Sequence, residues 1–270
     1  MTVINIYSLN KNHKEQMNLF YSKDDGYLDL EKIAENMGKF NSLILDNGVV
    51  DGEGFLKVKF TEYDGIKVLE AFATGQGSLG YYAQAYIDSD NESDYVNSRK
   101  QQQQFYSKAK IFILETYYVI VVFEDTTEEK IKGSIKNLIE KLGFEVSNFR
   151  LTDTLMRNIR NKYKWNEVRL EKVKNEQDST TKVQYEKDVA DSENDSLIDS
   201  LYKDQGKMVY ISFELPAENI EGNVPNFISV KLYKNDHRIV INQKELPNNN
   251  ELKKFIIYLS NKIIEIVGGE

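Results

Sequence analysis

Cysteine is absent from the 270 residues, and histidine occurs only twice, at His13 and His237. The lack of cysteine excludes a disulfide framework and thiolate chemistry, and it favours a reducing compartment. Two histidines are too few for a zinc site built from several His or Cys ligands. A Ser-His-Asp triad would need one of them, and no G-x-S-x-G elbow exists to hold its serine. We therefore expect no resident metal and no cofactor.

Long apolar runs are also missing. No stretch is long enough to span a bilayer, and no N-terminal apolar run resembles a signal peptide. Together with the missing cysteines, this predicts a cytoplasmic protein with no membrane partner. The net charge of −8 argues against a wholly basic nucleic-acid surface. The 40% of hydrophobic residues suffices for a real core.

The strongest pattern lies in Ile111–Leu151 and reads strand, strand, helix, strand. Tyr117–Phe123 is apolar without alternation, which is typical of a central strand with both faces covered. Thr126 and Glu129 have the spacing of a capping box at a helix start. Gly143 stands where that helix needs a left-handed C-cap. Between them runs an apolar stripe at helical spacing, formed by Ile131, Ile135, Leu138, Ile139 and Leu142.

The patterns around this unit predict an α+β fold in which mixed β-sheets are covered by amphipathic helices. Apolar residues almost vanish in Asn175–Asp195, which is rich in Glu, Asp, Ser and Thr and is typical of a linker or mobile loop. We therefore expect two domains. Residues 1–174 form an N-terminal α+β domain, and residues 205–270 form a strand-rich segment closed by a long helix. Residues 175–204 form an acidic linker that could include a short helix.

The closing helix has an unusually wide apolar face. We expect Asn250 as its N-cap, and a core stripe that includes Phe255 and Leu259. Ile257 and Ile264 lie off that stripe. Two interpretations stay open: the helix is buried on two sides within the chain, or its second side forms a dimer seam over residues 250–267.

Two other stretches match binding motifs only in part. Gly75, Gly77 and Gly80 match G-x-G-x-x-G, but a hairpin pattern precedes them and a strand-like segment follows. We interpret them as a Gly-rich loop and not as a dinucleotide site. Asp88–Asp94 has the alternate-residue spacing of a calcium loop but lacks its glycine and its closing glutamate. This favours a solvated acidic loop.

Residues 157–174 are basic, with seven Lys and Arg against two Glu, a net charge of +5. Basic residues with nearby aromatics suit a phosphate backbone with stackable bases. The candidate nucleic-acid-binding residues are Arg157, Arg160, Lys162, Lys164, Trp165 and Arg169. The alternative is a solvated helix face and a strand whose charges pair with the acidic segment that follows. That segment could also mask the basic residues in the free protein.

The C-terminal half has a recognisable layout: strand Phe227–Tyr233, strand Arg238–Ile241, then Leu246–Phe255 and a long closing helix. Together with the basic segment Met156–Lys162, this layout resembles the family of lambda-type phage exclusion proteins such as RexA and related phage-conflict proteins. The resemblance implies a dimer that binds duplex DNA without reading its sequence and acts in phage–host conflict. The overall acidity and the long acidic linker depart from that pattern.

Three functions remain open at this stage. The first is a non-enzymatic nucleic-acid-binding protein of phage–host conflict, with DNA or RNA as partner. The second is a protein–protein interaction subunit or inhibitor in a defence assembly. The third is a divergent metal-dependent nuclease, because 43 acidic residues leave room for a carboxylate-only site. The sequence leans toward a protein that is not an enzyme.

Overall fold

The computed structural model describes residues 1–11, 23, 26–87, 96–173, 179–188, 196–217, 225–246 and 248–268. The strands are β1 (Thr2–Lys11), β2 (Leu43–Ile44), β3 (Val50–Asp51), β4 (Gly54–Tyr63), β5 (Ile66–Tyr86), β6 (Asn97–Leu114), β7 (Tyr118–Phe123), β8 (Phe144–Asn148), β9 (Trp165–Glu171), β10 (Lys182–Glu186), β11 (Lys207–Pro216), β12 (Phe227–Tyr233) and β13 (Arg238–Ile241). The helices are α1 (Leu30–Met37), α2 (Lys132–Glu140), α3 (Asp153–Lys162), α4 (Leu197–Tyr202) and α5 (Asn249–Gly268), with short 3-10 helices η2 (Glu128–Ile131) and η3 (Gln243–Glu245).

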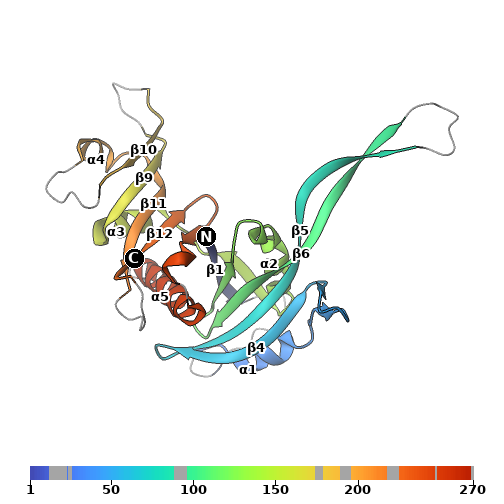
Figure 1. Ribbon diagram of the computed structural model, residues 1–270. Coiled ribbons are helices and arrows are strands. Elements are labelled where there is room, and N and C mark those ends of the chain that lie inside the picture. The colour runs from blue at the N-terminus through green and yellow to red at the C-terminus, as the bar shows by residue number, and fades with distance from the viewer. Residues whose placement is uncertain are drawn as a thin grey trace.

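Eleven of these strands form one sheet that runs through the molecule (Figure 1). The order along it is β10-β9-β11-β12-β13-β1-β7-β6-β5-β4, and β8 also pairs with β1. The α+β class is confirmed. The paired strands of this sheet are antiparallel rather than mixed.

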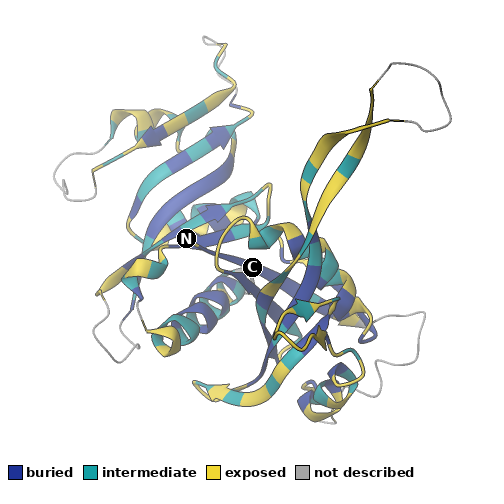
Figure 2. Ribbon diagram, turned by 45° about the vertical axis from the view of Figure 1, so that its right-hand side comes forward, coloured by how far each residue is buried: buried dark blue, intermediate teal, exposed yellow. Residues whose placement is uncertain are grey.

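The predicted central unit lies in the middle of the sheet. Side chains of β7 alternate between two buried cores, with Val121 in the core that includes α1 and α2 and Ile120 in the core that includes α3 and α5. All five residues of the predicted helical stripe are buried in the first of these cores. Gly143 has φ +100°, as a left-handed helix end requires. Figure 2 shows the buried strands at the centre and the exposed residues at the periphery.

The start of this helical segment differs from the predicted capping box. The capping role falls to Asp125 and Glu128 instead of Thr126 and Glu129. Asp125 Oδ1 accepts the Glu128 amide at 2.9 Å, and the Glu128 carboxylate accepts the Glu124 amide at 2.8 Å. A carboxylate one residue earlier thus satisfies amides that the start of the helix leaves without an intrahelical partner.

The predicted Gly-rich loop is wrong, because residues 75–80 lie inside β5. A Cβ on Gly75 would come within 2.9 Å of the Ser134 Cβ, and a Cβ on Gly77 within 2.8 Å of the Phe105 ring. These glycines therefore let the strand pack closely on α2 and on the neighbouring strand. They do not open a turn toward a dinucleotide.

The sheet continues across the predicted boundary between domains. β1 pairs with β13, with Val3 opposite Val240, so strands from both predicted domains share one sheet. The two-domain division stays a prediction. The segment assigned to an acidic linker contains α4, where a short helix was expected, and β10, which was not. β10 pairs with β9, with Tyr185 opposite Val168, so residues 182–186 belong to the sheet.

The wide apolar face of α5 is buried within the chain. Phe255, Leu259 and the off-stripe Ile257 are all buried in the core shared with α3 and the sheet. The helix start is two residues earlier than predicted, because Asn248 Oδ1 accepts the Asn250 amide at 2.9 Å. A dimer seam over residues 250–267 stays a prediction. The described side chains of this helix include no exposed large hydrophobic residue that would favour it.

Candidate functional site

Trp165 of the predicted nucleic-acid interface belongs to the core. It is 6% exposed, with Tyr185 edge-on at 6.0 Å between ring centres. The Arg160 and Lys187 cations lie 5.4 and 4.7 Å from the indole centre. Arg160 Nη2 lies 2.6 Å from Asp199 Oδ2, and the other oxygen of Asp199 accepts the Tyr185 hydroxyl at 2.7 Å. A ring this buried cannot stack on a base, which corrects the sequence-based role.

Arg157 closes the C-terminal end of α4 and does not stand free on α3. Its guanidinium donates to the backbone carbonyl oxygens of Lys203, Gln205 and Gly206, and its Nε lies 3.0 Å from Asp153 Oδ2. Cationic side chains commonly satisfy the last carbonyls of a helix in this way. The structure thus uses Arg157 and Arg160 to hold α4 and the following turn against α3.

The remaining three predicted residues are more accessible. Lys162 and Lys164 are exposed, and Arg169 is half-buried. The Lys164 ammonium lies 6.0 Å from the ring centre of Phe227, and Arg169 Nε donates to Gln184 Oε1 at 3.0 Å. The six candidates therefore do not share one exposed face. The acidic segment pairs with part of the basic one through Asp199 and Arg160, although the alternative interpretation expected such pairs on the strand and a solvated helix face.

β5 and β6 extend beyond the body of the molecule as a two-stranded arm (Figures 1 and 2). β4 pairs with β5 only as far as Thr74, and β7 pairs with β6 only from Lys110 onward. Beyond these points, residues 75–86 and 97–109 pair with each other along the arm. In the described residues, both outer edges of the arm therefore lack a strand partner.

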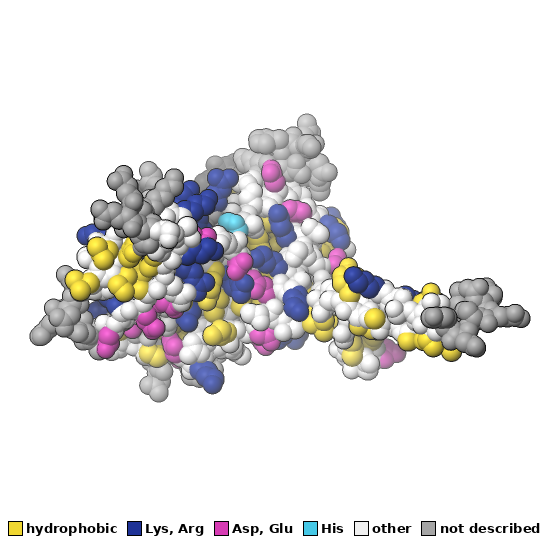
Figure 3. All heavy atoms as spheres, turned by 90° about the horizontal axis from the view of Figure 1, so that it is seen from above, with side chains coloured by type: hydrophobic (Ala, Val, Ile, Leu, Met, Phe, Trp, Pro, Cys, Tyr) yellow, Lys and Arg dark blue, Asp and Glu magenta, His cyan; other side chains and the backbone are white. Residues whose placement is uncertain are grey.

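Apolar and cationic side chains lie on the surface of the arm (Figure 3), and its strands also carry amides such as those of Gln76, Gln102 and Gln104. Exposed large hydrophobic residues on it are Leu79, Tyr81, Tyr82, Tyr86, Ile87, Val96 and Tyr106. The Arg99 and Lys100 cations lie 5.8 and 5.9 Å from the ring centres of Tyr86 and Tyr81. Apolar side chains gathered on a projecting element are typical of an interaction site.

The two edges of the arm differ in regularity. The pairing shifts between Ser78 and Tyr81 on β5, where Gly80 has φ +109°, while β6 advances by only two residues, from Gln104 to Gln102. The extra residue is thus on β5. A bulge twists its strand and disfavours further pairing on that side. β6 presents the more regular free edge.

A cluster of three lysines surrounds one buried carboxylate on the face of the sheet that α5 covers. Glu70 is 3% exposed. The ammonium groups of Lys110 on β6 and Lys253 on α5 lie 3.1 and 2.7 Å from its Oε1, and that of Lys59 on β4 lies 3.5 Å from its Oε2. No pattern in the sequence marks this cluster, because its members come from four elements and form no local motif.

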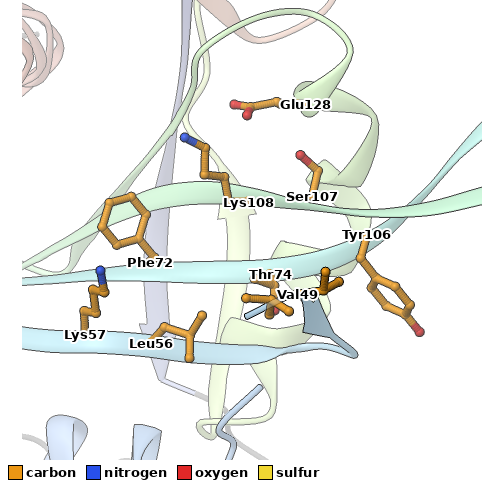
Figure 4. A pocket seen from close by; sticks show the side chains of 10 residues that line it. Val49, Leu56, Lys57, Phe72, Thr74, Tyr106, Ser107, Lys108 and Glu128 are labelled. Atoms are coloured by element: carbon orange, nitrogen blue, oxygen red, sulfur yellow. The ribbon is translucent and has the colours of Figure 1, made fainter. Parts of the chain in front are cut away.

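Two cavities open beside this cluster. One of about 290 Å³ is lined by Lys110 and Lys253 among others. The other, of about 520 Å³, shares Phe72, Lys108 and Glu128 with the first. Figure 4 shows the larger one, with Lys108 extending toward Glu128 above the strands. Because they share these three lining residues, the two cavities adjoin, and together we call them the recess, with one lysine-rich and one more apolar part.

Other predicted sites find no counterpart in the part of the chain that the structure describes. No group of three or more His, Cys, Asp or Glu side chains could hold a metal ion there. His13 and Asp88–Asp94 lie outside the described residues. None of the described helices has both the length and the apolar character to cross a bilayer.

Comparison with known proteins adds no relative. No family model matches the chain, and no curated protein matches it either. The resemblance to the phage exclusion proteins therefore remains a hypothesis, and the features of the chain that bear on function are the arm, the basic segment and the lysine-lined recess.

Proposed function

We propose that this protein is a non-enzymatic protein–protein interaction subunit, and that its β5–β6 arm pairs with the arm of a second copy. The free edge of β6 over residues 97–109 is the observation that supports this most. An unpaired strand edge offers a row of N–H and C=O groups that another strand can satisfy. Adding a strand to such an edge is a recurrent mode of recognition.

The sequence of β6 is complementary to itself in the antiparallel sense. Pairing centred between Gln102 and Gln103 sets the amides of Gln101–Gln104 opposite those of the second copy. It also places Arg99 and Lys100 beside the aromatic end of the partner strand, at residues 105–106. Like charges then avoid each other, and cation–aromatic pairs form across the interface.

Charge favours a protein partner over nucleic acid at the arm. Residues 88–94, between the two strands, include four acidic residues, whereas residues 97–109 contain three basic ones. An acidic stretch at this place would repel a phosphate backbone. A role in phage–host conflict rests on the layout resemblance alone and is part of the same proposal.

Sedimentation of the full chain tests the proposal. Wild type should sediment as a dimer at micromolar concentration. The double variant Gln102→Lys/Gln103→Lys should be monomeric, because it places like charges opposite each other at the centre of the pairing. The matched control Ala85→Lys/Ile87→Lys adds the same two charges to exposed positions on or just after β5. That control should stay dimeric.

A wild type that remains monomeric at 100-fold higher concentration would contradict the proposal, as would dimers of the Gln102→Lys/Gln103→Lys variant. A monomeric wild type that retains DNA, and retains it more tightly with the added lysines, would assign the arm to nucleic acid.

Nucleic-acid contact through residues 157–169 is a second candidate function. It is favoured by the ion pair between Arg160 and Asp199, because an acidic segment placed over basic residues could be displaced by phosphates. Opening of the α4 contact would add Arg157 and Arg160 to the exposed Lys162 and Lys164.

Asp199→Ala should therefore strengthen DNA retention at low salt. Each additional phosphate neutralised changes the slope of log affinity against log salt by about −0.9, so the slope should steepen by about 1–2. Asp204→Ala removes the same charge from an exposed position just after α4 and should leave the slope unchanged. Equal slopes for wild type and both variants would remove this candidate.

A further inference from the structure

The cluster around Glu70 carries more positive than negative charge in a confined place. Three ammonium groups share one carboxylate, and the side chains of Lys110 and Lys253 are only 20% and 17% exposed. Burial, together with the neighbouring Lys253, lowers the pKa of Lys110 to about 8 in spite of its hydrogen bond to Glu70. A further anion beside these lysines would relieve their repulsion.

The recess next to the lysines offers room for such an anion. Besides Lys110 and Lys253, the smaller cavity is lined by Gln243 and Asn249, which supply amide groups. Its two carboxylates are largely occupied: Glu124 pairs with Lys108 at 2.6 Å, and Glu128 accepts a backbone amide. Burial raises the pKa of Glu128 above its ordinary value.

The larger cavity favours a ligand with a planar or apolar part. It is lined by Val49, Val50, Leu56, Phe72 and Tyr106 as well as by Lys57 and Thr74. Ligand sites commonly combine an apolar lining with a few charged groups that fix orientation. The volumes of about 290 and 520 Å³ suit a small molecule and not a polymer.

We propose that this recess binds a small phosphate ester of the nucleotide class. Its phosphate lies against the ammonium groups of Lys110 and Lys253, and its base and sugar occupy the larger cavity beside Phe72. Lysine is a common phosphate ligand that acts as a point charge. This site lies mainly on β5, β6 and α5 in the body of the molecule, and it shares Tyr106 with the arm, so its test leaves Tyr106 unchanged.

Substitutions at Glu70 and at the lysines should change ligand affinity in opposite directions. Its carboxylate competes with the phosphate for the same two ammonium groups. Glu70→Gln should therefore bind the phosphate ester more tightly than wild type, whereas loss of either lysine should weaken binding. A cluster that serves only to hold α5 on the sheet would change stability in these variants but would not change ligand affinity in opposite directions.

Calorimetric titration of the full-length protein with ADP, and separately with inorganic phosphate, is the experiment. Wild type should bind ADP, and Lys110→Gln and Lys253→Gln should each bind it about tenfold more weakly or worse, the effect of losing one charge-assisted hydrogen bond. Lys162→Gln, at an exposed lysine outside the recess, should bind like wild type. Val50→Trp, which fills the larger cavity, should weaken ADP binding and spare phosphate.

Thermal melting shows whether each variant is folded and provides a second measure of ligand binding. ADP should raise the melting temperature of wild type, and it should raise that of Glu70→Gln by more. Neither increase should occur in variants that also carry Lys110→Gln. The proposal is overturned if neither ADP nor phosphate binds wild type at millimolar concentration. Equal ADP affinity in wild type, Lys110→Gln and Lys253→Gln would overturn it as well.

Discussion

Trp165→Ala is expected to lower the free energy of unfolding by about 3–5 kcal/mol, the range for deleting a buried large aromatic side chain. The indole is 6% exposed and packs in the core with Tyr185. Its removal also eliminates the cation–aromatic contacts with Arg160 and Lys187. Each such contact contributes about 0.5–2 kcal/mol to stability. Denaturant titration followed by far-ultraviolet circular dichroism measures the loss.

Trp165→Phe is the matched control, because it keeps an aromatic ring in the same place. It should lose less than half as much stability. A cost below about 1 kcal/mol for Trp165→Ala, close to the effect of an ordinary surface substitution, would mean that the ring is accessible. That result would support the base-stacking role of Trp165 that the sequence predicted.

Glu70→Gln is expected to lower the free energy of unfolding by about 3 kcal/mol. Removal of one partner from a buried ion pair costs about 3–5 kcal/mol, because the other charge is left without compensation. We expect the lower end of that range, since Lys59 is 54% exposed and water can solvate it. Glu62→Gln, at an exposed carboxylate of β4, should change stability by no more than about 0.5 kcal/mol.

A second substitution shows whether the lysines cause this loss. In the Glu70→Gln background, Lys253→Met should cost less than it does in wild type, because the charge it removes is no longer paired. Additive costs would show that Glu70 and Lys253 are not coupled.

The same cluster makes stability depend on pH. Although burial opposes it, the hydrogen bonds from Lys253 and Lys110 hold the pKa of Glu70 below its ordinary value of 4.5. The carboxylate thus binds a proton less readily when folded than when unfolded. Its stabilisation is fully present above about pH 4.5 and is lost as the pH falls through the lowered pKa. Glu70→Gln should lack this part of the acid-induced loss.

Local patterns in the sequence determined most of the individual elements. The apolar run of β7, the stripe of α2 and the cap of α3 depend on residues within one or two turns of each other. Thr152 Oγ1, for example, accepts the Leu155 amide at 3.0 Å, three residues further along the chain. The predicted capping box at Thr126 and the predicted N-cap at Asn250 failed, because several polar residues compete within two positions and only geometry decides which side-chain oxygen reaches the free amides.

The tertiary structure alone decided which of these residues are available for function. Arg157, Arg160 and Trp165 have the composition of a nucleic-acid interface, yet α4 and β10 return over them from further along the chain. Gly75 and Gly77 have the spacing of a loop, yet Ser134 of α2 lies so close to Gly75, and the Phe105 ring so close to Gly77, that an added Cβ would force a neighbour to move. The free edge of β6 and the three lysines around Glu70 depend on which strands become neighbours. That choice is made by long-range pairing and burial, which no window of the sequence contains.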